Sequence, residues 1–153
     1  MPAATPKRTN NGWLEPLERP ALAALAARMP SWVTPDFLTA IGFAGALMTF
    51  CAYVLAGWDA TWLWVASLGF VVNWFGDSLD GTLARYRQIE RPRYGYFLDN
   101  AIDLITQLML AAGIALSGFI YGELSFLALS VFLMMSVLSL LRANVSGVFQ
   151  LSY

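Results

Sequence analysis

The chain has 153 residues, of which 58% are hydrophobic and 12% are charged, and its mean hydropathy of +0.59 is typical of a membrane protein rather than of a soluble domain of this size. The formal net charge of −1 provides no basic field that would recruit nucleic acid, so no nucleic-acid partner is expected. Histidine is absent and Lys7 is the only lysine, which excludes Ser/His triads, His-ligated zinc and intramembrane Schiff bases. Carboxylates remain as candidate general bases. The single cysteine, Cys51, cannot form an intrachain disulfide.

Residues 1–33 form a polar, proline-bearing N-terminal segment that we expect to lie in the cytoplasm. The alanine-rich run between Pro20 and Pro30 predicts an interfacial helix with Pro20 in its first turn. Two interpretations of this helix are open. It either helps to cover a functional site in the rest of the chain, or it anchors the chain with Trp13 and Trp32 at the level of the lipid headgroups.

Four stretches without a charged residue follow, and each approaches the roughly 20 residues that cross a bilayer. They are residues 37–58, 60–76, 104–122 and 124–141. The first is too long for the apolar region of a signal peptide, so no cleaved signal is expected. Thr34, Pro35 and Asp36 predict the start of the first helix, because threonine caps free amides, proline fits the first turn and aspartate complements the helix dipole. Residues 34–153 are therefore predicted to form an all-α, polytopic bundle of four spanning helices.

All basic residues lie on one side of this predicted topology. They precede the first span, connect the second span to the third, or close the fourth: Lys7, Arg8, Arg19, Arg28, Arg85, Arg87, Arg91, Arg93 and Arg142. The connections at 57–59 and 121–123 contain no basic residue, so the positive-inside rule places both termini and the central loop in the cytoplasm. The expected location is the inner or plasma membrane of a prokaryote. Arg87, Arg91 and Arg93 are interpreted as a topology and anionic-lipid signal rather than as substrate ligands.

Small residues recur in the first and third spans, where they allow helices to approach closely in lipid. They are Gly42, Ala44, Gly45 and Ala46 in the first span, and Ala111, Ala112, Gly113 and Ala115 in the third. Tight helix packing is the predicted role of these residues. The short connections leave no room for a separate soluble domain, so a single bundle is expected.

Two aspartates lie near the end of the otherwise apolar second span, where placing a charge in a membrane is costly. At about 100° per residue, one helix face carries Asp77, Asp80, Gly81 and Ala84. Gly81 and Ala84 either let a bulky ligand approach the helix backbone or pack against another helix, and both interpretations are open. Arg85 either pairs with a phosphate or extends to the membrane surface.

The start of the third span carries Gly95, Asp99 and Asp103 at intervals of four, which places them on one face. Because the connecting loop is short, the second and third spans are predicted to be antiparallel neighbours with their acids converging on one pocket. An all-oxygen, negative pocket suits Mg²⁺ or Mn²⁺, and two ions at ~3.5 to 4 Å separation fit such a site. Spacing alone leaves a proton or cation pathway, or solvated helix ends, as alternatives.

The segment from Asp77 to Asp103 reads Asp-x-x-Asp-Gly-x-x-Ala-Arg, then nine residues, then Gly-x-x-x-Asp-x-x-x-Asp. This pattern resembles the full signature of the CDP-alcohol phosphotransferase (CDP-alcohol phosphatidyltransferase) family. The resemblance implies transfer of a substituted phosphate from a CDP-linked lipid donor, such as CDP-diacylglycerol, to a polar alcohol with release of CMP in phospholipid synthesis. Asp36 stands where many members have asparagine. The rival interpretation is a cation-binding or ion-conducting membrane protein without enzymatic activity.

Site roles also follow from the resemblance, residue by residue. It implies that two divalent cations are held by Asp77, Asp80, Asp99 and Asp103, and that Asp103 also acts as the general base. The cytidine nucleotide would be lined by Asp77, Gly81, Ala84 and Arg85, with Gly95 as the second glycine of the motif.

Members of the family usually have six spanning helices, whereas this chain stops at Tyr153 after the fourth apolar run, so a fragment or a short variant is expected. Arg142 is then the candidate contact for a phosphate on the acceptor. The acceptor is left open among glycerol phosphate, inositol phosphate, serine and other alcohols, as is a diacylglycerol acceptor with a CDP-amino-alcohol donor. A homodimer is compatible with the sequence.

Overall fold

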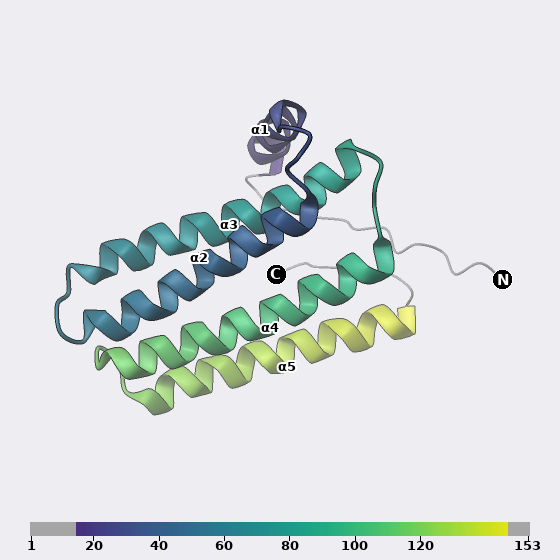
Figure 1. The fold of residues 1–153 in the computed structure, drawn as a ribbon. Helices are drawn as coiled ribbons and strands as arrows, with labels where there is room; N and C mark the ends of the chain where they lie inside the picture. Colours follow the sequence, from purple (N-terminus) through teal and green to yellow (C-terminus); the bar gives the residue numbers. More distant parts are fainter. Residues whose placement is uncertain (1–14, 147–153) are drawn as a thin grey trace.

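The computed structural model describes residues 15–146, which form five α-helices and no strand (Figure 1). The helices are α1 (Glu15–Arg28), α2 (Pro35–Ala56), α3 (Trp62–Tyr86), α4 (Pro92–Ser117) and α5 (Gly122–Ser146). Helices α2 to α5 run alternately up and down, with the α2–α3 and α4–α5 connections at one end and the α3–α4 connection at the other (Figure 1). The predicted all-α bundle is confirmed.

Three of the long helices are apolar enough to cross a membrane by length and composition. These segments are Pro35–Ala56, Tyr94–Ser117 and Gly122–Ser139. Helix α3 is as long and lies alongside α2, but it carries Asn73, two aspartates and Arg85, which lower its mean hydropathy (Figure 1). The chain is an integral membrane protein. Of the four predicted spans, the second is the one absent from these three segments, because α3 carries the polar motif.

Exposed aromatic side chains mark both ends of the bundle. Trp58, Trp64 and Tyr121 are each 80% exposed near the α2–α3 and α4–α5 connections. At the other end Trp32 is 69% exposed and stacks edge-on against Phe37, with ring centroids 5.7 Å apart. Aromatic rings at both levels are typical of the two membrane interfaces. Trp13 lies outside the described residues.

The start of α2 follows the predicted capping signal. The Thr34 side chain accepts a hydrogen bond from the Phe37 amide at 3.1 Å, and Pro35 and Asp36 occupy the first turn. At the far end of α4, Gly118 adopts a φ of +76° and ends the helix in the left-handed conformation that glycine accommodates without strain. The start of α2 and the end of α4 are therefore determined by residues close to them in the sequence.

Helices α2 and α3 approach so closely that their backbones touch. A Cβ added at Gly76 would lie 2.4 Å from the Gly42 nitrogen, and one at Gly45 would lie 2.8 Å from the Gly69 carbonyl oxygen. Asn73 strengthens the interface by donating a hydrogen bond to the Gly42 carbonyl at 3.0 Å. The packing role predicted for Gly42 and Gly45 is confirmed.

We expect Gly76→Ala to lower the free energy of unfolding by about 1–3 kcal/mol, because the new methyl group would meet α2 backbone that cannot move aside. Gly95→Ala is the matched control, since a Cβ at Gly95 meets nothing within 4 Å. That control should be neutral or stabilising by up to about 1 kcal/mol through helix propensity. Denaturant unfolding of both variants in detergent measures the difference, and equal stabilities would contradict the backbone contact.

Helix α2 also packs against α4, so it lies between α4 and α3. Gly113 on α4 faces Phe50 and Tyr53 of α2, which confirms its predicted packing role, and the Ser125 hydroxyl of α5 donates to the Ala111 carbonyl of α4 at 2.7 Å. The antiparallel relation of α3 and α4 was predicted correctly, but the residues described here show no extensive packing interface between them. Their acid-bearing faces offer little apolar surface to bury, whereas the glycines of α2 fit α3.

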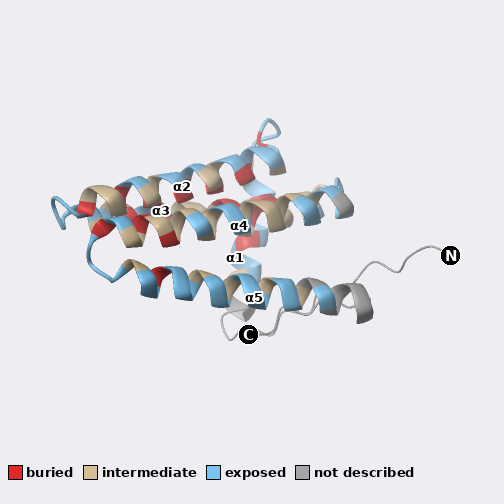
Figure 2. Ribbon diagram, turned by 90° about the horizontal axis from the view of Figure 1, so that it is seen from below, coloured by how far each residue is buried: buried red, intermediate tan, exposed pale blue. Residues whose placement is uncertain are grey.

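Helix α1 packs across the end of α3 (Figure 1). It begins at Glu15, so the prediction that Pro20 lies in the first turn is wrong: the proline removes one backbone hydrogen bond inside the helix without beginning it. Leu22 and Ala26 share a buried cluster with Leu79 and Leu83 of α3. Figure 2 shows buried residues on α2 and α3, whereas α5 is largely exposed. The contact with α3 favours the covering interpretation of this helix.

Candidate active site

The signature acids lie at the end of the bundle where α3 passes to α4. Asp80 is buried, with 7% of its surface exposed, whereas Asp77 is exposed on the same helix. On α4, Asp99 is half-buried and Asp103 is exposed. Asp80 interacts electrostatically with both Asp99 and Asp77, so carboxylates from α3 and α4 share one region although α2 separates much of the two helices.

Within residues 15–146, no three acidic, cysteine or histidine side chains are close enough together to hold a metal ion as they stand. The full convergence of four carboxylates therefore remains a prediction, and so does the position of Asp103 relative to the other three. The donor chemistry nevertheless fits hard divalent cations, because every candidate ligand is a carboxylate and the charges of Asp77 and Asp99 both repel that of Asp80.

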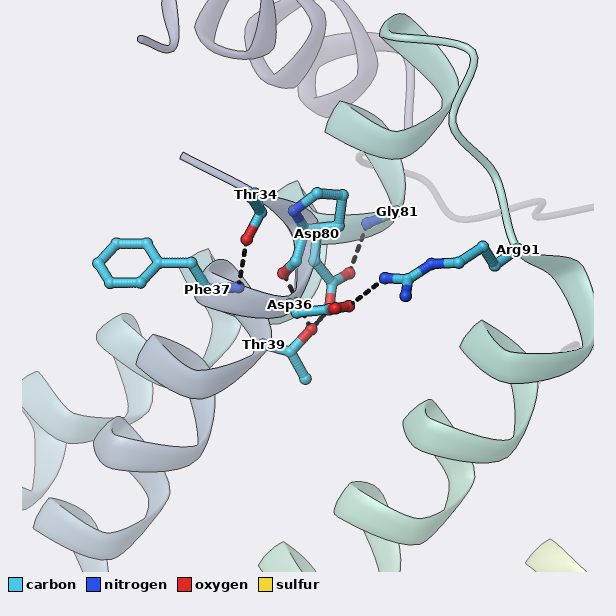
Figure 3. Close-up of polar contacts among 8 residues, drawn as sticks. Thr34, Asp36, Phe37, Thr39, Asp80, Gly81 and Arg91 are labelled. Carbon is cyan, nitrogen blue, oxygen red and sulfur yellow. Dashed lines mark hydrogen bonds and ion pairs between the residues drawn. The ribbon is translucent and has the colours of Figure 1, made fainter. Parts of the chain in front are cut away.

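The Asp80 carboxylate is held from two sides (Figure 3). The Thr39 hydroxyl of α2 donates to Oδ2 at 2.6 Å, and the Gly81 amide donates to Oδ1. This pair of hydrogen bonds satisfies a carboxylate that would otherwise be costly to bury. Thr39 had no recognisable sequence signal, because a threonine inside an apolar helix gives no indication of a partner 41 residues away.

Arg91 links the start of α4 to the first turn of α2. Its guanidinium forms an ion pair with the Asp36 carboxylate (Figure 3). The guanidinium also lies 4.5 Å from the centre of the Tyr94 ring. The hydrogen bond to Asp36 raises the pKa of Arg91. Both side chains are about half exposed, so the pair contributes little to the stability of the fold. Its effect is mainly to orient the loop beside the acids.

Arg87 fastens the segment between α1 and α2 to the end of α3. Its guanidinium donates to the carbonyls of Met29 at 3.1 Å, Pro30 at 2.7 Å and Val33. Three backbone acceptors for one guanidinium make a structural clamp, which the interpretation of Arg87 as a topology or lipid signal did not include. The side chain of Arg93 is not described.

The two motif glycines differ from the packing glycines of α2 and α3. A Cβ at Gly81 would first meet the flexible Arg85 guanidinium at 3.3 Å, and one at Gly95 would meet open space. Arg85 itself is exposed and donates to the Thr82 hydroxyl at 3.2 Å. Ala84 is half-buried on the same face. Gly81 and Gly95 therefore have no helix partner that requires a missing side chain, which favours the ligand-approach interpretation of Gly81 over the packing one.

Arg142 falls within the last turns of α5, but its side chain lies outside the described residues. Its suggested contact with an acceptor phosphate therefore stays a prediction. The same holds for Lys7 and Arg8 in the topology argument. The end of the bundle that carries the acids is where α1 and the α1–α2 segment meet the end of α3. Three described arginines lie near this end: Arg28, Arg85 and Arg87.

Comparison with known proteins relates the sequence of this chain to a family. Residues 32–150 match the family model of CDP-alcohol phosphatidyltransferase. The chain is 34% identical over 135 residues to an archaetidylinositol phosphate synthase of Pyrococcus horikoshii, covering 87% of this chain and 65% of the relative. It is 34% identical over 105 residues to a phosphatidylinositol phosphate synthase of Cutibacterium acnes, covering 69% of this chain and 46% of the relative.

The chain thus spans 65% and 46% of the lengths of these two relatives. No solved structure matches it. The family match extends over most of the sequence and includes the whole acidic motif on α3 and α4. The chain belongs to the CDP-alcohol phosphatidyltransferase family.

Proposed function

We propose that this chain transfers a substituted phosphate from a CDP-linked lipid, such as CDP-diacylglycerol, to a polar alcohol in phospholipid synthesis. The observation that supports the proposal is that Asp80 interacts electrostatically with Asp77 of α3 and Asp99 of α4, so both halves of the motif act on the same end of a membrane bundle. The names of both relatives favour an inositol phosphate headgroup in the product, and hence an inositol phosphate acceptor.

In the proposed reaction, the acceptor hydroxyl oxygen forms a bond to the phosphorus that carries the lipid. The bond from that phosphorus to the bridging oxygen of the pyrophosphate breaks, and CMP leaves with the bonding electrons. Asp103 accepts the proton of the hydroxyl, the role that the family motif implies for it, and the absence of histidine leaves a carboxylate as the candidate base. Gly81, Ala84 and Arg85 line the cytidine nucleotide, where Gly81 lets the ligand approach the helix backbone.

The residues that would hold Mg²⁺ or Mn²⁺ are Asp77, Asp80, Asp99 and Asp103, with two ions as the expected number. A divalent cation bound there would supply Lewis-acid stabilisation of charge on the leaving CMP. Carboxylates that repel one another would gain from such an ion, which is the physical reason to expect it. Asp80 accepts hydrogen bonds from the Thr39 hydroxyl and the Gly81 amide, which limit the rotation of its carboxylate.

We place the acid-bearing end of the bundle in the cytoplasm, because the arginines of the described loops lie at that end and the opposite connections contain none. Residues 34–153 would form the catalytic bundle, and residues 1–33 a cytoplasmic segment whose helix covers its end. A prokaryotic plasma membrane and a homodimer are compatible with this arrangement.

The test is CMP release by the purified protein from CDP-diacylglycerol, with inositol phosphate, glycerol phosphate or serine as acceptor. We expect release with Mg²⁺ or Mn²⁺ and loss of turnover in excess chelator, because clustered carboxylates need a hard cation. Restored activity after the ion is returned is the control for denaturation. Full turnover in chelator would exclude the metal, and Mn²⁺ binding without CMP release from any pair would favour the cation-binding alternative.

A further inference from the structure

Two buried threonines on α2 face α3, and they differ in what they bind. Thr49 is 3% exposed and its hydroxyl lies 3.0 Å from the Gly45 carbonyl and 3.3 Å from the Ala66 carbonyl. Thr39 is 9% exposed and its hydroxyl lies 3.1 Å from the Pro35 carbonyl but 2.6 Å from the Asp80 carboxylate. Each hydroxyl has one proton, so the shorter contact identifies the acceptor of Thr39 as Asp80.

The hydrogen bonds of Asp80 leave part of its carboxylate available. Oδ2 accepts from Thr39 and Oδ1 accepts from the Gly81 amide. A carboxylate offers about four lone-pair sites, so each oxygen retains one for another ligand. One hydrogen bond comes from the backbone of α3 itself and the other from α2, the helix that packs on both α3 and α4 (Figure 3). The orientation of the Asp80 carboxylate therefore depends on the position of α2, because Thr39 of α2 holds one of its oxygens.

We propose that Thr39 is a positioning residue whose hydroxyl fixes the Asp80 carboxylate in the orientation that binds a divalent cation. The proposal rests on the proposed function, in which Asp80 is a cation ligand. Groups that hydrogen-bond a metal ligand from behind limit its rotation, and removing them typically lowers metal affinity or activity by about 10- to 100-fold. Thr49, which meets only backbone carbonyls, has no such effect on the site.

The experiment titrates Mn²⁺ alone into purified protein in detergent micelles and measures free Mn²⁺ by electron paramagnetic resonance, without donor or acceptor. Thr39→Val keeps the shape of the side chain and removes the hydroxyl, and it should weaken Mn²⁺ binding by about 10- to 100-fold. Thr39→Ser, which restores a hydroxyl, should bind Mn²⁺ close to the parental affinity. Thr49→Val removes an equally buried hydroxyl from the same helix and should leave Mn²⁺ affinity unchanged.

Equal Mn²⁺ affinities of Thr39→Val and Thr49→Val would overturn the proposal, and so would a Thr39→Ser variant as weak as Thr39→Val. Thr39→Ala removes the same hydroxyl with less bulk and replaces the valine variant if that variant does not fold. Asp80→Asn distinguishes a failure of the proposed Thr39 role from a failure of the proposed metal site. If Asp80→Asn loses Mn²⁺ while Thr39→Val does not, only the role of Thr39 fails; if Asp80→Asn binds Mn²⁺ like the parent, the proposed metal site itself fails.

Discussion

We expect Asp103→Asn to lower the turnover of CMP release by about 10²- to 10⁴-fold, the usual contribution of a general base, and to retain most of the binding of the CDP-linked lipid. Asparagine keeps the size of the side chain and one of its oxygens but cannot take the proton of the acceptor hydroxyl. Asp103 is exposed on α4, so the substitution leaves the buried packing of the bundle intact. Single-turnover CMP release and donor binding, both at saturating Mn²⁺, measure the two effects separately.

Asp59→Asn is the matched control for this substitution. Asp59 lies between α2 and α3 at the other end of the bundle, where its carboxylate accepts a hydrogen bond from the Thr61 amide at 2.9 Å. The control should release CMP at the parental rate. If Asp103→Asn did the same, the proton would have to pass to water or to a substrate phosphate, and the assignment of the base would be wrong.

The helices were predictable because their signals are local. Stretches without charge gave the approximate spans, and Thr34 with Pro35 marked the start of α2. The start of α1 was missed because a single proline is tolerated within the early turns of a helix that other residues favour. Which helices touch was harder to predict, because the position of α2 between α3 and α4 depends on complementary surfaces far apart in sequence.

The roles of the glycines were hard to predict for the same reason, because they depend on which helix lies beside them. Gly76 and Gly81 both occur near the end of α3, yet one meets the α2 backbone and the other meets only an arginine side chain. Sequence alone leaves each glycine open to packing or to ligand approach, since the distinction depends on the neighbouring helix. The acidic motif was recognisable because its meaning lies in the order and spacing of several residues along two consecutive helices.

Contacts from a distant helix account for what the sequence did not indicate. Thr39 reaches Asp80 across 41 positions, and Arg87 reaches Val33 across 54. Neither contact follows from helical periodicity, which relates only residues a few positions apart. Both support the acid-bearing end of α3 from outside, so the site depends on α1 and α2 as well as on the helices that carry the motif.

Asp80→Asn should weaken Mn²⁺ binding, donor binding and turnover together, each by more than about 100-fold, because loss of a charged ligand exceeds the loss of a group behind it. Asp80 is the most deeply buried of the signature acids that the structure describes, and it interacts electrostatically with Asp77 of α3 and Asp99 of α4. Mn²⁺ titration without substrate, followed by donor binding and CMP release, gives the three values.

The control for Asp80→Asn is Asp36→Asn, the same chemical change at a nearby but half-exposed carboxylate. Asp36 pairs with Arg91 at the surface, where an exposed ion pair contributes little to stability, so Mn²⁺ affinity should stay at the parental value. Asp80 and Asp103, two of the four aspartates of the motif, should then differ in mechanism: Asp80→Asn should lose binding and turnover together, whereas Asp103→Asn should lose turnover and keep binding. A variant of Asp80 that binds Mn²⁺ normally yet releases no CMP would move Asp80 from cation ligand to a role in the chemical step.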